Sequence, residues 1–382
     1  MTHTSIKTEN LICLFKNNKR NFIIVLCLII TSLFTLYFIW TNESYYNKVI
    51  AKITTITEQE SQAQGMNGKL EPIKKQEIKA IIINGTLKGK EIKLENTTSY
   101  SGAYDLNLKV NDEVFVSIQQ NNTPSYKILD VKRDKYTAYI TILFILLILI
   151  IGGYKGFKSL TSVIINIIIF SLTILLFLRG YNLILVASTA SILFITVSIA
   201  LVNGINKKAI SAVVGTLAGT IFTMLITAAV IKLTHSNGIH YEEMEFLTHP
   251  PEQIFFIEIM IGTLGAIMDI AISISSAINE IYDKNPYIEN KVLVDSAREI
   301  GKDIMGTMSN TLVFAYISGS IPMILLLLKN DFPFFYIIHV NLSLEIIRAL
   351  TGSIGIVISI PITIYTSVFL VKKHKIGEVS NQ

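Results

Sequence analysis

The sequence predicts an α-helical protein that crosses a membrane several times and carries one small β-domain outside it. Apolar residues make up 51% of the 382 residues and charged residues only 16%, and the mean hydropathy is +0.52. Apolar runs of about 20 residues, the length that crosses roughly 30 Å of hydrocarbon, recur along the chain. A polar segment with strand patterning separates the first run from the second. A single water-soluble core is therefore excluded.

Eight apolar runs predict membrane-spanning helices: an N-terminal anchor and a bundle of seven. The second run is short unless Tyr136 and Tyr139 anchor it at the interface. No small-residue cleavage site follows Trp40, which favours an uncleaved anchor over a signal peptide. The runs are Phe22–Trp40, Tyr136–Ile151, Leu160–Leu178, Leu183–Val202, Ala209–Leu233, Ile254–Ala277, Met305–Leu328 and Ile346–Val371.

Lys and Arg in the short connections predict the orientation, because cytoplasmic loops are enriched in them. With the N-terminus inside, the inner flanks hold fourteen and the outer flanks four, namely Arg179, Lys232, Lys329 and Arg348. The prediction is a multi-pass protein of the cell membrane with both termini in the cytoplasm. Its domains are a tail at 1–21, the anchor at 22–40, an extracytoplasmic stalk and β-domain at 41–135, the bundle at 136–371 and a tail at 372–382.

The net charge of +5 is accounted for mostly by these inner flanks and calls for no nucleic-acid partner. The lipid bilayer is the partner that the composition predicts. Cys13 and Cys27 fall in the tail and the anchor, so the outer domain is expected to contain no disulfide.

The outer domain is expected to begin with a polar helical stalk or linker over residues 41–68 and to continue as five short strands. Gly-containing turns and alternating apolar residues carry this prediction. A small β-barrel or β-sandwich follows, acting as a binding module or as a compact spacer. The expected strands are Glu77–Asn84, Lys90–Glu95, Tyr104–Val110, Val114–Gln119 and Tyr126–Val131.

Three carboxylates mark the most informative feature of the bundle. Glu258, Asp269 and Glu280 are eleven residues apart, and eleven steps of about 100° return to within about 20° of the start, so they share one helix face. Gly262, Gly265, Ser273 and Ser276 lie on or near the same stripe. A carboxylate such as Asp269 at membrane depth costs roughly 3 kcal/mol, which makes it a functional-site candidate with an expected partner.

Two interpretations of the stripe stay open. It can be a proton, cation or solute path, with Asp269 as the deep charged group and Glu258 and Glu280 at the outer and inner ends. Alternatively it is a packing seam, since small residues and Ser let helices approach closely. In either case Asn310, one to two turns into the next span, or Ser309 beside it could hydrogen-bond Asp269.

Other small residues are predicted to pack helices rather than bind a ligand. Gly215 and Gly219 form a small-xxx-small pair in the fifth span, and Gly306 begins a Gly/Thr-rich segment in the seventh. Gly262 and Gly265 on the stripe suit the same purpose.

Motifs for other chemistry are weak or missing. The loop after the fifth span holds His235, His240 and His249 with several glutamates, but their spacing matches no tight metal-ligand motif. The sequence also lacks a phosphate-binding Gly-Lys-Ser/Thr loop, a metalloprotease His-Glu pair and a nucleophile-base constellation. We expect no metal, no cofactor, no catalytic residue and no enzymatic activity.

Three segments together resemble the YibE/F family of bacterial membrane proteins. They are the span that follows Arg133 and ends at Gly152–Gly156, the segment Gly265–Ala271 with Ser275, Ser276 and Glu280, and the segment Gly301–Leu312. The resemblance covers residues 84–371 and places Asp269, Glu280, Gly306 and Asn310 in its signature segments. It implies the longer, outer-domain-bearing type, with a shorter paralogue as a partner; a homo-oligomer is the alternative. It implies no particular reaction.

The sequence therefore predicts an integral membrane protein that transports or exports a small solute or ion, with Asp269 at the centre of the path. The alternative is a membrane scaffold that transports nothing and recruits partners through its outer β-domain.

Overall fold

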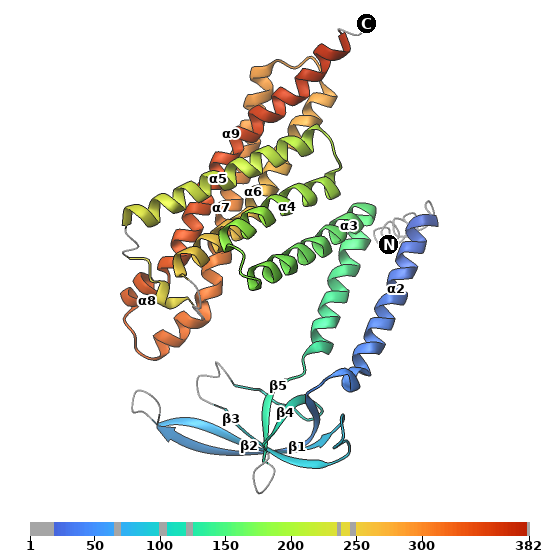
Figure 1. Cartoon of the computed structure of the whole chain (residues 1–382), viewed down its shortest axis with the longest axis vertical. Coiled ribbons are helices and arrows are strands. Elements are labelled where there is room, and N and C mark those ends of the chain that lie inside the picture. Colours follow the sequence, from blue (N-terminus) through green and yellow to red (C-terminus); the bar gives the residue numbers. More distant parts are fainter. Residues whose placement is uncertain are drawn as a thin grey trace, which may run out of the picture. The chain divides into compact units, whose positions relative to one another are not determined.

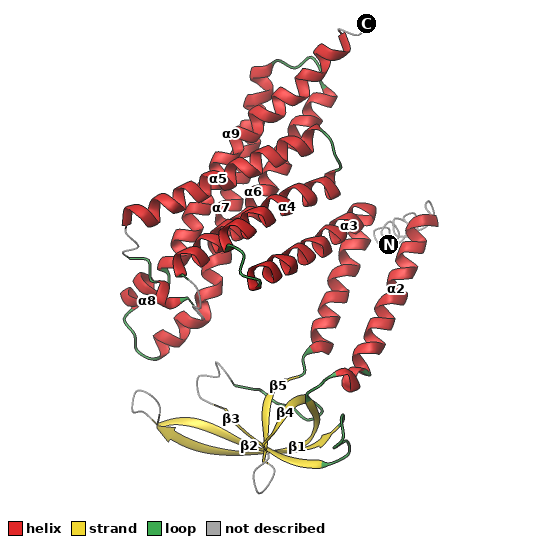
Figure 2. Cartoon of the chain, viewed as in Figure 1, coloured by secondary structure: helices red, strands yellow, loops and turns green. Residues whose placement is uncertain are grey.

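The computed structural model describes residues 19–64, 70–98, 105–119, 125–234, 238–244 and 250–379 (Figures 1 and 2). These residues belong to two compact units, Met1–Phe157 and Lys158–Gln382. Most of the predicted N-terminal tail, including Cys13, lies outside the described residues. Within them, six helices are long and apolar enough to cross a membrane.

The first unit consists of helix α2 (Lys19–Trp40), a short 3₁₀ helix η1 (Asn42–Tyr45), one antiparallel sheet and the start of α3 (Asp134–Leu178). The strands are β1 (Val49–Gln64), β2 (Leu70–Ile82), β3 (Glu91–Thr98), β4 (Glu113–Gln119) and β5 (Ser125–Val131). Their order in the sheet is β3-β2-β1-β4-β5. The edge strands β3 and β5 also contact each other, so the sheet is strongly curled.

Apolar residues that alternate along the strands form the core of this sheet. Ile53 and Ile78 are at most 1% exposed, and Ile92 and Leu94 supply the buried positions of β3. The neighbouring positions carry Lys, Glu and Thr and are exposed. Because side chains of a strand point alternately to its two faces, this pattern buries one face and hydrates the other.

The prediction of a helical stalk or linker over residues 41–68 is wrong, because residues 49–64 are strand β1. Beyond Ile56 this strand is mostly polar, and cross-strand pairs with β2 support it. Gln76 Nε2 donates to Glu58 Oε1 at 2.8 Å, and Lys74 Nζ lies 4.0 Å from Glu60. Such pairing depends on the partner strand, so the polar pattern of one segment does not indicate it.

The prediction of a strand at Tyr104–Val110 is also wrong for residues 105–110, which pair with no other described strand. Tyr104 lies outside the described residues. The alternation there still buries Leu108, which is 3% exposed. A side chain supports the segment, since Asn96 Nδ2 donates to the carbonyl of Leu106 at 2.9 Å.

Helix α3 combines the second and third predicted spans in 45 residues, with a break at Gly153. There φ is +52° and ψ is −128°, a conformation that glycine adopts far more readily than residues with a Cβ. The break falls between the two predicted apolar runs.

The second unit contains the C-terminal part of α3 and the helices of the bundle. These are α4 (Leu183–Asn203), α5 (Lys207–Thr234), η2 (Tyr241–Glu243), α6 (Pro251–Lys284), α7 (Asn290–Lys329), α8 (Phe334–Val340) and α9 (Ser343–Val379). The helices α5, α6 and α9 pack against one another, while α4 contacts α5 and α6 and α7 contacts α6 and α9 (Figure 1). This arrangement makes α6 a central helix.

The first part of α7 is amphipathic and packs on the bundle. Leu293, Ala297 and Gly301 are buried in one stripe and continue the core that α6 and α9 form with Ile274 and Ile360. Their spacing of four keeps one face of α7 on the bundle, and the charged residues between them remain exposed.

Candidate functional site

Helix α6 separates an apolar face from the predicted polar stripe. Phe255, Ile259, Ile267, Ile270, Ile274 and Ile278 are fully buried. By contrast, the stripe residues Glu258, Gly262, Gly265, Asp269, Ser273 and Glu280 are at least partly exposed, as is Ser276. Since α6 rises about 1.5 Å per residue, Glu258 and Glu280 are about 33 Å apart along the helix, which is roughly the thickness of the hydrocarbon layer.

The deep carboxylate of the stripe is not joined to the predicted partner on α7. Among the described residues no hydrogen bond or ion pair involves Asp269, Ser309 or Asn310; Asn310 is exposed on α7. Asp269 on α6 therefore remains separate from Ser309 and Asn310 on α7 within the described bundle.

The two ends of the stripe differ in how their charges are balanced. Glu280 forms an exposed ion pair with Lys284 on the same helix, at 3.1 Å. Glu258 is bound by Arg348 of α9, which also donates to Glu345 one turn earlier on α9. Side-chain exposures are 12% for Arg348 and 17% for Glu345, but 44% for Glu258.

The surroundings of Arg348 hold its side chain in the interior of the bundle. Its guanidinium carbon lies 5.2 Å from the centre of the Phe255 ring, a cation–π geometry. Its Nε is buried without a hydrogen-bond partner among the described residues, as is the hydroxyl of Tyr316 on α7. The Tyr316 hydroxyl lies against Gly262, where a Cβ would collide with it.

A surface hollow of about 550 Å³ opens beside Glu258. Its walls come from the end of α3, the start of α4 and the first half of α6. Glu258 is the charged residue among its lining residues, which are Phe177, Leu183, Ile254, Ile257, Glu258, Ile261 and Gly262.

Of the five predicted packing glycines, Gly262 lies against Tyr316 and the other four form two pairs. Gly215 and Gly219 lie directly against α9: a Cβ at Gly215 would collide with Thr363, and one at Gly219 would lie 2.8 Å from the Ser359 side chain. At Gly265 and Gly306, in contrast, a Cβ would meet nothing within 4 Å among the described residues. Close packing thus explains the first pair and does not explain the second.

Four buried hydroxyls of α5 and α9 are satisfied within their own helices, whereas the buried Ser367 hydroxyl of α9 has no hydrogen-bond partner among the described residues. Thr216, Thr220 and Thr223 each donate to the carbonyl four residues earlier, and Thr363 does the same on α9. Because these groups bond their own backbone, the seam holds two helices close together and offers no continuous polar path.

No group of three potential metal ligands occurs among the described residues. His240 Nδ1 lies 2.7 Å from Glu242, and its ring contacts that of His339 at 5.5 Å. His235 and His249 lie outside the described residues.

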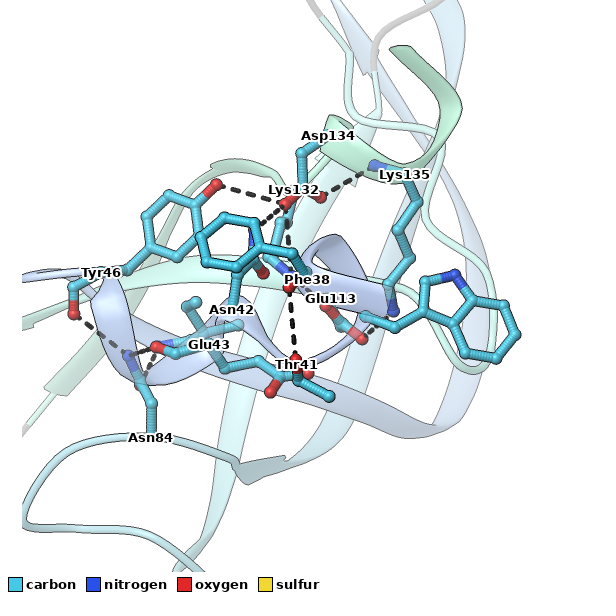
Figure 3. Close-up of polar contacts among 12 residues, drawn as sticks. Phe38, Thr41, Asn42, Glu43, Tyr46, Asn84, Glu113, Lys132, Asp134 and Lys135 are labelled. Carbon is cyan, nitrogen blue, oxygen red and sulfur yellow. Dashed lines mark hydrogen bonds and ion pairs between the residues drawn. The ribbon is translucent and has the colours of Figure 1, made fainter. Parts of the chain in front are cut away.

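A second polar cluster, missed by the sequence analysis, joins the sheet to both adjoining helices (Figure 3). Lys132, at the end of β5, is 4% exposed. Its Nζ lies 2.9 Å from Glu113 on β4 and 3.5 Å from Asp134 at the start of α3. Lys135 pairs with the same Glu113. Asn42 of η1, which directly follows α2, donates to Asp134 at 2.9 Å.

The charges in this cluster stabilise one another. Burial alone would raise the pKa of Glu113, but hydrogen bonds from Lys135 and Lys132 hold it below its ordinary value. Burial would likewise lower the pKa of Lys132, yet the hydrogen bond and charge of Glu113 raise it above the ordinary value. Both groups are therefore charged at neutral pH and fix the sheet against the helix ends.

Nearby, Asn84 ties the turn between β2 and β3 to the same region. Its Oδ1 accepts from the amide of Ile50 at 2.7 Å. Its Nδ2 donates to the carbonyl of Glu43 at 3.0 Å (Figure 3) and to that of Lys48 at 2.9 Å. Trp40 at the end of α2 donates to the Tyr139 hydroxyl on α3 at 3.0 Å. These contacts join α2, the sheet and α3 into one structural joint.

Comparison with known proteins identifies two matching regions. The profile of the family described as YibE/F-like protein matches residues 140–373, and that of the YibE/F family N-terminal domain matches residues 44–131. The first covers the bundle and the second the sheet. No curated protein and no solved structure gives a significant match.

Proposed function

The chain belongs to the YibE/F-like family, and on that premise we propose that it moves a small solute or ion across the bilayer along the polar face of α6. The observation that carries the proposal is the position of Asp269. It lies midway along an exposed polar stripe that is about as long as the hydrocarbon layer is thick.

A packing seam within the bundle accounts poorly for this stripe. Gly265 has open space where a neighbouring helix would lie, and the helices that bury α6 do so on its isoleucine face. The open space at Gly265, one turn from Asp269, leaves room for a solute or ion beside the Asp269 carboxylate. A charged group at that depth costs roughly 3 kcal/mol, which favours binding of a proton or cation there.

The proposed topology has eight crossings, with both termini in the cytoplasm of the cell membrane. The break at Gly153 supports two crossings within α3, and α2 supplies the anchor. In this topology the Glu258 end of the stripe lies outside and the Glu280 end inside. The proposed movement of the solute or ion is therefore along the α6 axis, between the outer and the inner side of the membrane.

Flux measurements test the proposal directly. Proteoliposomes loaded with a pH-sensitive dye are exposed to a potassium-diffusion potential, alone and with a panel of metabolites and metal ions. We expect proton or coupled solute flux for the wild-type protein and flux at the protein-free level for Asp269→Asn. The control is Asp295→Asn, which removes an exposed carboxylate of α7 that is paired with Arg298 and should leave flux unchanged.

Two results would contradict the proposal in different ways. Wild-type flux equal to that of empty liposomes across the whole panel removes the transport function. Undiminished flux in Asp269→Asn keeps transport but removes Asp269 from its path.

A scaffold function is the second candidate, and one observation favours it. Strand β1 pairs with β4 only over Val49–Lys52, so its polar half up to Gln64 has no described strand on that side. An unpaired strand edge can accept a strand from another protein. A scaffold predicts co-purifying partners that are lost on deletion of residues 73–132, together with no flux.

A further inference from the structure

From the hollow beside Glu258 we infer that the outer end of α6 binds a monovalent amphipathic organic cation. This inference names a substrate class for the proposed function and depends on that function for its biological role, although binding itself requires no transport. It stands on three features of the structure: the charge balance around Arg348, the lining of the hollow and its size.

The charge balance leaves one negative charge in excess. Arg348 supplies one positive charge, whereas Glu258 and Glu345 supply two negative charges. Glu345 is mostly buried beside Arg348 and can balance it alone. Glu258 is the more exposed carboxylate and forms part of the hollow, so it is the group that a ligand can reach.

The lining of the hollow defines the rest of the ligand. Ile254, Ile257 and Ile261 of α6 and Leu183 of α4 present apolar surface, and Phe177 adds an aromatic ring. Aliphatic and aromatic walls favour apolar groups, and an aromatic face also attracts a cation. A small hydrated inorganic ion would leave these walls without a complementary surface.

The size of the hollow suits an organic molecule. Its volume of about 550 Å³ lies within the range of roughly 300–1,000 Å³ for small-molecule sites. A neutral lipid chain would match the apolar walls but not the carboxylate, and an anion would be repelled by it. A delocalised organic cation matches both features.

Binding of two probes with similar shape and different charge tests the inference. Radiolabelled tetraphenylphosphonium and neutral triphenylphosphine oxide are each equilibrated with the full-length protein in nanodiscs, and binding to empty nanodiscs is subtracted. We expect saturable binding of the phosphonium, one per chain, and binding of the neutral probe weaker by at least about tenfold, because the neutral probe gains no attraction from Glu258.

Variants separate charge from structure. Glu258→Gln should weaken phosphonium binding by about tenfold, whereas Glu258→Asp should retain most of it. Glu345→Gln should also weaken binding, because Arg348 would then be balanced by Glu258 alone. Glu280→Gln, at the other end of the stripe and paired with Lys284, is the matched control and should bind as the wild type does. The elution volume in size-exclusion chromatography and the thermal unfolding curve, each compared with the wild type, verify that each variant is folded.

Equal binding of the charged and neutral probes, or unchanged phosphonium binding in folded Glu258→Gln, overturns the inference. Failure of the inference is distinguishable from failure of the proposed function. Proton flux that depends on Asp269 without phosphonium binding removes only the inference, while phosphonium binding without any flux removes only transport.

Discussion

Replacement of Lys132 by Met should loosen the joint between the sheet and the membrane helices. The Lys132 side chain is 1% exposed and contacts Glu113 and Asp134. Removal of its charge leaves Glu113, with a side chain that is 9% exposed, dependent on Lys135 alone. Methionine has a similar length, so the change removes charge and hydrogen bonds with little loss of volume.

The expected loss is about 3 kcal/mol of local stability. Removal of one partner of a buried ion pair typically costs about 3–5 kcal/mol, because the other charge remains buried without compensation. The lower end of that range applies here, because Lys135 still reaches Glu113 and compensates part of its charge. The loss does not fall below the range, because the Lys135 side chain is 31% exposed and its compensation is therefore weak. A change of about 1.4 kcal/mol is tenfold, so local opening should become about a hundredfold more frequent.

Hydrogen exchange in the full-length protein in nanodiscs measures this effect. The amides of β4 and β5 should exchange about a hundredfold faster in Lys132→Met, because their protection reports opening of the joint. Lys127→Met changes an exposed lysine of the same strand and should leave exchange within about twofold of the wild type.

The double variant Glu113→Met/Lys132→Met should lose less protection than the sum of the single variants, since neither charge of that pair is then left unpaired. Exchange in Lys132→Met within about twofold of the wild type would refute the reasoning. An equal acceleration in Lys127→Met would refute it as well, because the effect would not belong to the buried charge.

Three further predictions follow from single sites. Gly355→Ala should lower the free energy of unfolding by about 1–3 kcal/mol in thermal unfolding, because its Cβ would collide with Thr223. Gly265→Ala, which meets nothing within 4 Å, should instead raise the free energy of unfolding by about 0.5–1 kcal/mol, because alanine favours the helix more than glycine does. Gly153→Ala should change thiol labelling of Lys155→Cys, in a background without Cys13 and Cys27, because alanine at φ +52° is strained by roughly 1–2 kcal/mol; Gly152→Ala, with ordinary φ and open space, is its control. Fluorescence of Trp40, the single tryptophan, should report loss of the joint in acid and in strong base. The pKa of Glu113 is lowered, so its stabilising contribution is lost as the pH falls through that pKa; the pKa of Lys132 is raised, so its contribution is lost as the pH rises through that pKa. Lys132→Met should abolish the alkaline change.

Local periodicity was sufficient to predict the stripe on α6 and most of the membrane helices. Eleven-residue spacing places Glu258, Asp269 and Glu280 on one face regardless of what the helix packs against. Hydropathy located the apolar runs for the same reason. The break in α3 was consistent with two such runs, yet the positive φ at Gly153 is a backbone property that the pattern of apolar residues does not encode.

Contacts between distant residues account for what the sequence did not predict. By its position in the sequence Arg348 is a flanking charge, but it lies 90 residues from Glu258 in the chain and pairs with it only because α6 and α9 pack together. Lys132 and Glu113 meet through the pairing of β4 with β5. The polar half of β1 is a strand because β2 lies beside it. In each case the partner, rather than the residue's own neighbourhood, determines the structure.

The different environments of Glu258 and Asp269 suggest different tasks for the two carboxylates. Glu258 already contacts Arg348, so a cation arriving there shares the carboxylate with an existing partner and can leave again at small cost. Among the described residues Asp269 has no such partner, and a charge at its depth costs roughly 3 kcal/mol. A cation or proton that reaches Asp269 therefore removes a larger penalty than one that reaches Glu258. This difference provides a gradient of affinity from the end of the stripe toward its middle, which is what entry into a path requires.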